Sequence, residues 1–373
     1  MQRTISLVLN KDRVLCDTIF LYNRIVNEHV VYALQYKTLS KTALHHALYE
    51  PLRKKYPLFP SALLQCARDH AVEMLKGNKM NICTKKRLDS SIRFDKRSMK
   101  VFLQSGEIQF TTIHGRKKYQ VKVPEHFSKY FLWEIKSLNV GMNKTHMLVK
   151  VVVEGKVAEQ SKCSEVLGID VGLRNFAALS DGQIISSKEI NRVKRKYAHL
   201  RKIVQSQGTR AAKRKLQNIS GRERRFMTHY NHELTKYLAS LPYGAFAVED
   251  LKGIRKGRKG KVFNRKRSSW AYAQLRNFLE YKAEEQGKCV ILIDPKYTSQ
   301  QCKNCLYTHK ENRKGKIFHC KQCGYRADAD INASKNISRR GAKLFFEQAV
   351  VNQPYISNIS ALQSLGTTIK SEA

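Results

Sequence analysis

VLGIDVG, at residues 166–172, is the stretch of sequence that decides the fold of this chain. Its apolar residues predict a strand that is buried on both faces, as in α/β domains. Asp170 interrupts this strand, and a buried carboxylate is costly unless it is paired with a cation or bound to a metal. The apolar run FAAL at 176–179 and the turn SDG at 180–182 predict a second strand and its end.

Two further parts of the chain place carboxylates in similar positions. Glu249 interrupts a second apolar strand, FAVED at 246–250. Asp328 and Asp330 precede INASKNI at 331–337, which predicts a helix. Carboxylates from two strands and one helix can converge on two divalent cations about 4 Å apart, a pair that clamps a phosphodiester and activates a water. Oxygen ligands with room for water favour magnesium or manganese.

Each acid also has a simpler interpretation. Asp170 can close a turn with Gly172, Glu249 can pair with an arginine, and Asp330 can cap its own helix. The spacing by itself leaves these alternatives open.

Four of the nine cysteines form two C-x-x-C pairs separated by fourteen residues. Zinc prefers four soft ligands at tetrahedral corners, and each C-x-x-C turn presents two thiolates. This spacing predicts a structural zinc site rather than two redox or merely buried pairs, although His309 and His319 are candidate substitute ligands. The predicted ligands are Cys302, Cys305, Cys320 and Cys323. The scattered cysteines are expected to be small core residues in a reducing interior, and they are Cys16, Cys66, Cys83, Cys163 and Cys289.

The first half of the chain predicts a helical segment inside a β domain. Residues 1–10 have the pattern of a strand, and residues 11–79 contain three apolar patterns of helical period. Ser40 is the expected cap of the second helix, which should end before Pro51. From 84 to 155 the pattern changes, and the expected strands of a small barrel or sheet lie at 99–103, 107–110, 119–123 and 147–153.

The second half predicts an α/β domain with basic helices. Two long helices are expected over 187–240, a further helix over 268–286 and a third strand at 290–294. Residues 252–267 are dense in Lys, Arg and Gly. The last thirty residues have a polar Ser/Thr end and are expected to form a loose tail.

The charge of the chain indicates a polyanionic partner. It has 70 Lys and Arg against 30 Asp and Glu, a formal charge of +40 over 373 residues. A compact protein of this charge repels itself unless a nucleic acid neutralises it. No apolar run is long enough to span a bilayer, and the N-terminus lacks the apolar core of a signal peptide. We therefore expect a cytoplasmic protein without a membrane partner.

Several of these stretches together resemble the motifs of a known nuclease family. GIDVGLRN at 168–175 looks like the first motif of RuvC-type, ribonuclease-H-like nucleases, VEDL at 248–251 like the second, and DINASKNI at 330–337 like the third. With PKYTSQQC at 295–302, their order resembles that of the TnpB (OrfB) proteins of insertion elements, which are related to type V CRISPR effectors. The specific motifs span 166–337, and the N-terminal half is similar only in layout.

The resemblance implies an RNA-guided, metal-dependent DNA endonuclease. Such proteins bind a guide RNA derived from the insertion element, and base pairing selects the target DNA next to a short motif that the protein reads. Asp170, Glu249 and Asp330 match the positions of the catalytic triad that binds Mg²⁺ or Mn²⁺, with Asp328 as second choice for the third ligand. The expected location is then the interior of a prokaryotic cell, on the nucleoid when the protein is bound to DNA.

The resemblance also implies an α/β multidomain layout. A RuvC-like (ribonuclease-H-like) nuclease domain with a zinc-ribbon insertion follows a β-barrel domain with a helical insertion. The expected boundaries are 1–10 and 80–160 for the β-barrel (wedge) domain, 11–79 for the helical recognition insertion, 161–297 and 325–343 for the nuclease domain, 298–324 for the zinc finger that binds target nucleic acid, and 344–373 for a flexible C-terminal tail.

Basic residues are the expected contacts to phosphate groups. They lie on the helices between the first two motifs, in the run after the second motif, and in the finger. The candidates are Arg192, Arg195, Lys202, Arg255, Arg258, Arg265, Arg267 and Arg313. Trp270 is expected to pack its helix on the sheet, with stacking on a base as the alternative.

Two other functions compete with a guided nuclease. A DNA-binding regulator of transposition, RNA-guided or unguided, would bind without cutting, and relatives of that kind lose the acids that this chain keeps. A transposase that joins DNA ends would also use an acidic triad. The cysteine pairs directly before the last acid favour the nuclease.

Overall fold

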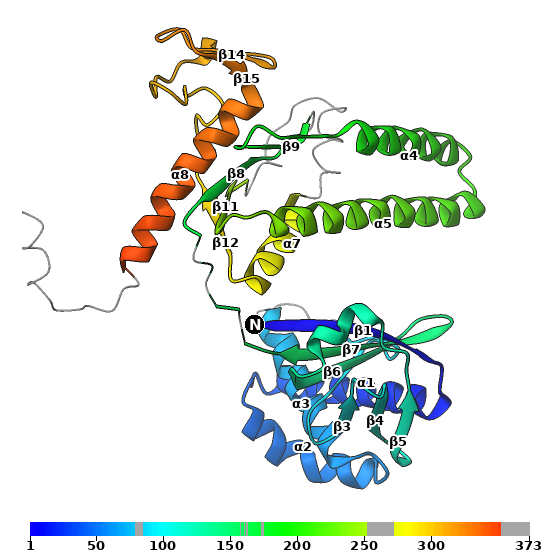
Figure 1. The fold of residues 1–373 in the computed structure, drawn as a ribbon. Helices are drawn as coiled ribbons and strands as arrows, with labels where there is room; N and C mark the ends of the chain where they lie inside the picture. Colours follow the sequence, from blue (N-terminus) through cyan, green and yellow to red (C-terminus); the bar gives the residue numbers. More distant parts are fainter. Residues whose placement is uncertain are drawn as a thin grey trace, which may run out of the picture. The chain divides into compact units, whose positions relative to one another are not determined.

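The computed structural model describes residues 1–78, 85–156, 158, 159, 161, 163–172, 175–251 and 272–351, with side chains as far as residue 347. The chain forms two compact units, Met1–Lys156 and Val157–Ala373, drawn in Figure 1. Each unit has its own hydrophobic core.

Unit 1 contains two antiparallel sheets, with the strand orders β1-β7-β6-β2 and β3-β4-β5. In β1, exposed and buried residues alternate, and the buried ones face the core, as the period of two in a strand requires. The described strands thus form two sheets where the sequence predicts a small barrel or sheet. The strands are β1 (Gln2–Asn10), β2 (Ile92–Phe94), β3 (Met99–Phe102), β4 (Glu107–Thr112), β5 (Gly115–Gln120), β6 (Glu134–Met142) and β7 (His146–Glu154), with the 3-10 helix η1 (Glu125–Tyr130) before β6.

Three helices follow β1 in the sequence, as predicted. Asp12 and Ser40 cap the first two by accepting hydrogen bonds from backbone N–H groups of the first turn. The prediction that the second helix ends before Pro51 is wrong, because the helix continues beyond it. Proline has no backbone N–H, so the helix lacks one hydrogen bond at Pro51. Burial of Leu44 and Leu52 offsets this loss. The helices are α1 (Arg13–Gln35), α2 (Lys41–Lys55) and α3 (Ser61–Gly77).

The strand predictions in unit 1 differ from the structure at β2, β5 and β6. β5 begins at Gly115 rather than Tyr119 and is almost entirely exposed, so its sequence has no apolar alternation. The sequence prediction omits β2, which has three residues, and β6, in which only Leu138 and Val140 are buried.

Unit 2 is built on a mixed five-stranded sheet of order β10-β9-β8-β11-β12. β8, β11 and β12 run parallel, whereas β9 is antiparallel to both β8 and β10. The strand predicted at 166–172 is therefore the central one, which explains why it is buried on both faces. The strands are β8 (Val166–Asp170), β9 (Asn175–Leu179), β10 (Ile184–Ser186), β11 (Ala245–Glu249) and β12 (Cys289–Ile293).

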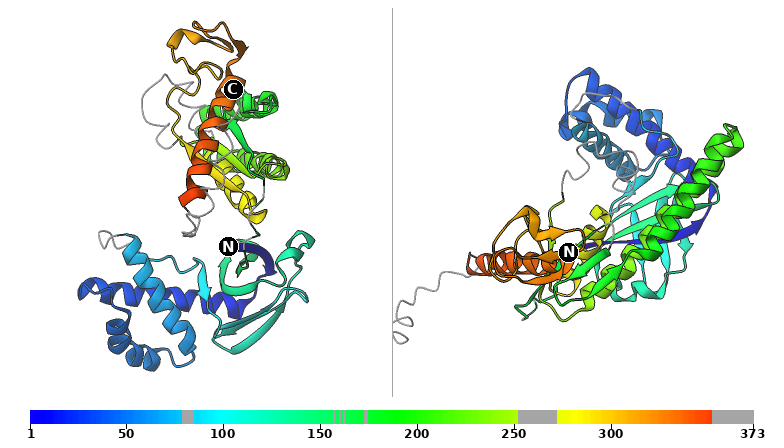
Figure 2. Two further views of the ribbon diagram at one scale, coloured as in Figure 1. Left: turned by 60° about the vertical axis from the view of Figure 1, so that its left-hand side comes forward. Right: turned by 90° about the horizontal axis from the view of Figure 1, so that it is seen from above.

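Helices cover both faces of this sheet. On one face α8 (Ala329–Val351) contributes Ile337 to a core with Val166 of β8 and alternate residues of β11 and β12. On the other face α5 (Arg210–Ser240) and α7 (Tyr272–Glu285) pack around Phe246. Figures 1 and 2 show α8 and α7 on opposite sides of the sheet. Unit 2 is therefore a mixed α/β fold in three layers.

Two long basic helices occupy the region 187–240, as predicted. α4 (Lys188–Ser206) lies beside α5, and both extend away from the sheet (Figure 1). Val204, Ala212 and Ile219 form a small core between them, and Arg201 pairs with Glu223. No helix in the described part of the chain has the length and apolar composition of a bilayer span.

Helix α8 is longer than the sequence predicts. It continues to Val351, so the prediction of a loose tail from residue 344 is wrong for residues 344–351. Leu344 and Phe345 pack against the core around Ile337, and such burial, more than intrinsic propensity, stabilises helices in proteins. Residues 352–373 lie outside the described residues.

The backbone of α8 lies directly against β8. A Cβ atom at Gly168 would collide with backbone atoms of Ser334 and Ser338. The hydroxyl of Ser338 also donates a hydrogen bond to the carbonyl of Val166 at 2.7 Å. This close approach brings the first turn of α8 to the end of β8.

The Gly168→Ala variant is expected to destabilise unit 2 by about 1–3 kcal/mol, the usual effect of overpacking a tight contact. The added methyl group must push α8 away from β8. The Gly221→Ala variant in the middle of α5 is the matched control. Its new Cβ lies 3.5 Å from the nearest atom, a guanidinium nitrogen of Arg225, so the change should stabilise the helix by up to about 1 kcal/mol. Urea unfolding of both variants measures the difference, and effects of the same sign would contradict the packing argument.

Candidate metal centres

Asp170 and Glu249 lie at one edge of the unit 2 sheet. They are the last residues of the neighbouring parallel strands β8 and β11, whose register pairs Ile169 with Val248. The carboxyl ends of parallel strands meet at the same edge, where α/β proteins commonly bind ligands. Both carboxylate residues are half-buried, while the residues before them are buried.

Asp330 reaches this edge from the first turn of α8. Its Oδ1 accepts a hydrogen bond from the guanidinium of Arg313 at 2.9 Å, and its Oδ2 accepts one from the side-chain amide of Asn175 at 3.0 Å. The charges of Glu249 and Asp330, and more weakly that of Asp328, act on Asp170. The structure thus brings together the three acids that the sequence singles out.

Asp328 has a different position. Its Oδ1 accepts hydrogen bonds from the backbone N–H groups of Asp330 at 2.9 Å and Ile331 at 3.3 Å. These are the contacts of a helix cap. The capping interpretation that the sequence offers for Asp330 therefore applies to Asp328.

The electrostatics of the site suit a cation. Burial and the neighbouring carboxylates of Glu249 and Asp330 raise the pKa of Asp170 to about 8. Burial also raises the pKa of Glu249, against a hydrogen bond that the Thr298 hydroxyl donates at 2.6 Å. Carboxylates that oppose one another's ionisation are stabilised by a positive charge. Carboxylate oxygens are the ligands that Mg²⁺ or Mn²⁺ prefers, and the guanidinium of Arg313 already holds one of them.

The stability of the metal-free protein is expected to fall as the pH rises. The pKa of Asp170 is raised from 3.8 to about 8 in the folded chain, so between these values the folded state holds a proton that the unfolded state releases. The free energy of unfolding therefore decreases across this interval. A divalent cation should restore stability most strongly at the alkaline end of this pH interval. The measurement is the Tm in magnesium-free buffer at about pH 6 and about pH 8.5, with and without added Mg²⁺.

The control for this prediction is the Asp170→Asn variant, which lacks the titrating group. Its Tm should fall less between the two pH values, and Mg²⁺ should raise it less, than in the native chain. Equal pH dependence of the two proteins would contradict the assignment to Asp170.

The four cysteines predicted as zinc ligands lie together. Their Sγ atoms are all within 4.8 Å of one another, with Cys302 and Cys323 at 3.7 Å and Cys305 and Cys320 at 3.5 Å. Thiolates about 2.3 Å from a tetrahedral zinc have similar spacing, so the donors fit a structural zinc. Burial alone would raise the pKa of Cys320, but hydrogen bonds from the backbone N–H groups of Cys323 and Gln322 and from neighbouring thiols lower it to about 7. This favours the thiolate that a metal needs.

The cysteine cluster belongs to a small module, defined here as residues 298–328. Its three strands are β13 (Arg313–Lys314), β14 (Ile317–His319) and β15 (Arg326–Asp328), preceded by the 3-10 helix η2 (Lys310–Asn312). Asn332 and Asn336 on α8 both donate to the carbonyl of Gln301, at 2.8 Å and 2.7 Å. β15 runs directly into α8. The position of Asp330 therefore depends on this cysteine module.

The other histidines and cysteines lie outside the cluster. His309 caps η2 with its side chain, and His319 lies in β14. The prediction of core positions for the scattered cysteines is correct for Cys66, which is buried, and wrong for Cys289, which is exposed at the start of β12. Cys83 lies outside the described residues.

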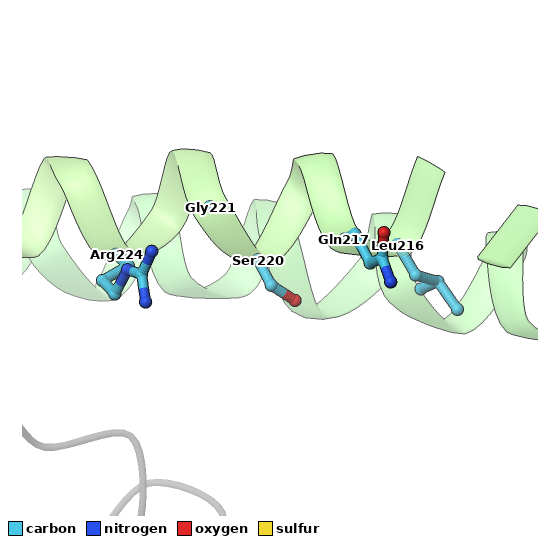
Figure 3. A pocket seen from close by; sticks show the side chains of 5 residues that line it. All are labelled: Leu216, Gln217, Ser220, Gly221 and Arg224. Carbon is cyan, nitrogen blue, oxygen red and sulfur yellow. The ribbon is translucent and has the colours of Figure 1, made fainter. Parts of the chain in front are cut away.

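Basic residues form an exposed surface on the α4–α5 pair. Arg192, Arg195 and Lys202 are exposed on α4, and the last two line an open depression with Arg201. Figure 3 shows a second depression on α5, lined by Leu216, Gln217, Ser220, Gly221 and Arg224. The other candidates Arg255, Arg258, Arg265 and Arg267, and also Trp270, lie outside the described residues.

Three residues contact the acids in ways that the sequence does not predict. Asn175 donates to Asp330, Thr298 donates to Glu249, and Arg313, expected at a phosphate, pairs with Asp330. Asn175 lies inside the motif at 168–175, and Thr298 lies inside the stretch at 295–302. A polar residue inside a motif was therefore the sequence signal that could have indicated a contact with the acids. No sequence signal indicates the partner of Arg313.

Two family models match the chain. Residues 146–253 match OrfB_IS605, described as "Probable transposase", and residues 272–337 match the "Cas12f1-like, TNB domain". The first segment contains Asp170 and Glu249, and the second contains the four cysteines and Asp330.

Curated relatives are similar to parts of the chain. The CRISPR-associated endodeoxyribonuclease Cas12f1 of Sulfoacidibacillus thermotolerans is 41% identical over 113 residues, 29% of this chain and 26% of that protein. InsQ of Escherichia coli strain K12, named as a proposed RNA-guided DNA endonuclease, is 29% identical over 231 residues, 56% of this chain and 57% of that protein. A TnpB-like protein of Methanocaldococcus jannaschii is 27% identical over 238 residues, 58% of this chain and 84% of that protein. The matches thus cover less than two thirds of Cas12f1 and of InsQ.

A solved structure has a similar fold. The cryo-EM structure of a Cas12f1–sgRNA–target DNA complex aligns with a TM-score of 0.65 at 15% identity, over 87% of this chain and 82% of that one. At this identity the likeness concerns the fold alone. The family models and the relatives add the likeness in sequence. In sequence the chain is therefore similar to TnpB-like (OrfB) proteins over its second half and to the Cas12f1 effectors around the cysteines and Asp330.

Proposed function

We propose that this chain is an RNA-guided endonuclease of the TnpB type, which cuts double-stranded DNA next to a short motif by metal-assisted hydrolysis of phosphodiester bonds. The observation that carries the proposal is the nearness of Asp170, Glu249 and Asp330 at one sheet edge, each in a stretch that resembles a motif of the family. The names of the relatives support it, since Cas12f1 is an endodeoxyribonuclease and InsQ a proposed RNA-guided DNA endonuclease.

The three acids would hold the Mg²⁺ or Mn²⁺ ions of the nuclease site. Bound cations supply charge neutralisation at the scissile phosphate and a water of lowered pKa. Asp170 and Glu249 are held by rigid neighbouring strands, which preorganises the oxygen donors. Thr298 orients Glu249, and Asn175 orients Asp330, through their hydrogen bonds.

The cysteine module would have a structural role at this site. Four thiolates fill the coordination sphere of a zinc, so the module has no place for a reacting water. Its strand β15 leads into α8 and presents Asp330 at the acidic edge. Its exposed basic loops would contact the target nucleic acid.

The basic surface on α4 and α5 would contact the guide RNA or its duplex with the target. Arg192, Arg195 and Lys202 are exposed, and the net charge of +40 needs a polyanion in the working state. Base pairing would supply the sequence specificity. We expect the RNA to derive from the end of an insertion element that carries this gene.

The domain layout expected from the family is kept in this proposal. Residues 1–10 and 80–160 would form the wedge domain, with 11–79 as the recognition insertion. The nuclease domain would then comprise 161–297 and 325–343, with the zinc finger of 298–324 between them.

The test begins with the RNA that copurifies with the full chain. Sequencing should reveal a discrete species with a constant scaffold and a variable end. A DNA plasmid that contains a match to the variable end should be cut in Mg²⁺, and a plasmid with a mismatched target should not. Tight binding without cutting in both Mg²⁺ and Mn²⁺ would favour a DNA-binding regulator instead.

A further inference from the structure

The cysteine module places a cation directly on the acidic site. The guanidinium of Arg313 lies 2.9 Å from Oδ1 of Asp330, and the two side chains are 33% and 17% exposed. Among the described residues, Arg313 is the only cation that forms an ion pair with one of the three acids. The other oxygen of Asp330 is held by the neutral amide of Asn175 at 3.0 Å.

The backbone of Arg313 is fixed by the fold of the module. Arg313 pairs with Phe318 across the β13–β14 hairpin, and Phe318 is fully buried in a cluster with Cys302 and Cys320. The Nε atom of Arg313 also donates to the carbonyl of Gly315 at 3.3 Å. The guanidinium is therefore presented by an element built around the four cysteines rather than by a free loop.

We propose that Arg313 is an internal counter-ion of the acidic site, which holds Asp330 while no metal is bound and competes with the divalent cation for this carboxylate. This inference rests on the proposed nuclease site. It adds that Arg313 lowers the affinity of that site for the divalent cation. With a divalent cation on Asp330, the guanidinium would stay beside the site on its hairpin, where it would be available to an incoming phosphate.

The charge of the donor explains why competition, rather than mere orientation, is expected. A carboxylate oxygen has two lone pairs, so a neutral amide such as that of Asn175 can share Asp330 with a metal. A guanidinium on the same carboxylate would repel a divalent cation held by that carboxylate, and half-burial would weaken the screening of this repulsion. Asn175 and Arg313 should therefore act on metal affinity with opposite signs.

The test measures the binding of Mn²⁺ to the full, zinc-loaded chain by electron paramagnetic resonance of the free ion. The Arg313→Gln variant should bind Mn²⁺ about tenfold more tightly than the native chain, since one partly screened positive charge is removed. The Arg313→Lys variant keeps the charge and should stay within about threefold of the native affinity. The Asn175→Ala variant loses an orienting bond and should bind more weakly. Equal zinc content and Tm show that the variants remain folded.

Two results separate the failure of this inference from that of the proposed function. Native or weaker Mn²⁺ affinity in Arg313→Gln, together with lost binding in Asp330→Asn, would overturn the counter-ion role alone. Native Mn²⁺ affinity in Asp330→Asn would overturn both, because Asp330 would then be no ligand. Tighter binding in Arg313→Gln, with native affinity in Arg313→Lys, supports the inference.

Discussion

The Asp170→Asn variant is expected to bind its RNA and target DNA but to cleave the DNA more than about a thousandfold more slowly than the native chain. Asparagine keeps the size of the side chain and removes the negative charge that the cations need. Asp170 lies at the end of the central strand, where the charges of Glu249 and Asp330 converge on it. The measurement is the single-turnover rate of cleavage at saturating RNA-loaded protein, with DNA binding measured in parallel.

The two acids at the start of α8 provide a matched pair for this experiment. Asp330→Asn should lose cleavage as Asp170→Asn does. Asp328→Asn should stay within about tenfold of the native rate, because asparagine caps a helix as well as aspartate and the cap is the contact seen for Asp328. If Asp328→Asn loses cleavage and Asp330→Asn keeps it, the third ligand has been assigned to the wrong acid.

The Cys320→Ser variant is expected to lose its zinc and, with it, the cleavage activity. Cys320 is buried in the cluster, and the loss of one thiolate from a four-thiolate site should reduce the zinc content from about one ion per chain to nearly none. Because β15 leads from the cluster into α8, the unfolding of the module should also displace Asp330. Zinc content by mass spectrometry and cleavage rate are the two measurements.

The control for the zinc experiment is Cys289→Ser. Cys289 is an exposed cysteine at the start of β12, away from the cluster. It should retain zinc, Tm and activity. Full activity in a Cys320→Ser protein without zinc would show that the module does not support the acidic site.

The sequence predicts a helix or strand well where buried apolar residues recur along it in a regular pattern. The strand at 166–170 is apolar because it lies at the centre of the sheet, and the period of α4 and α5 follows from the core between them. β5 and β6 give weaker signals because few of their residues are buried. The length of α8 beyond residue 343 is hidden for another reason, since Leu344 and Phe345 pack on the core around Ile337 rather than continue a clear local pattern.

The candidate site was predictable in its acids and not in its contacts. Asp170 and Glu249 each interrupt an apolar strand, which a sequence displays directly. The contacts of Asp330 with Asn175 and Arg313 join three segments that are far apart in the sequence. Such pairs follow from the close packing of α8 on Gly168 and from the register of the β13–β14 hairpin, and neither is visible in a residue pattern.

The separate hydrophobic cores of the two units have a practical consequence. One core is built from residues of Met1–Lys156, and the others are built from residues of the second unit. We therefore expect that the chain can be divided at this point into two co-expressed polypeptides, each with a hydrophobic interior of its own. If both halves bind the guide RNA, the RNA would hold the two polypeptides together in place of the peptide bond. Cleavage by such a split enzyme would then depend on the concentration of the RNA.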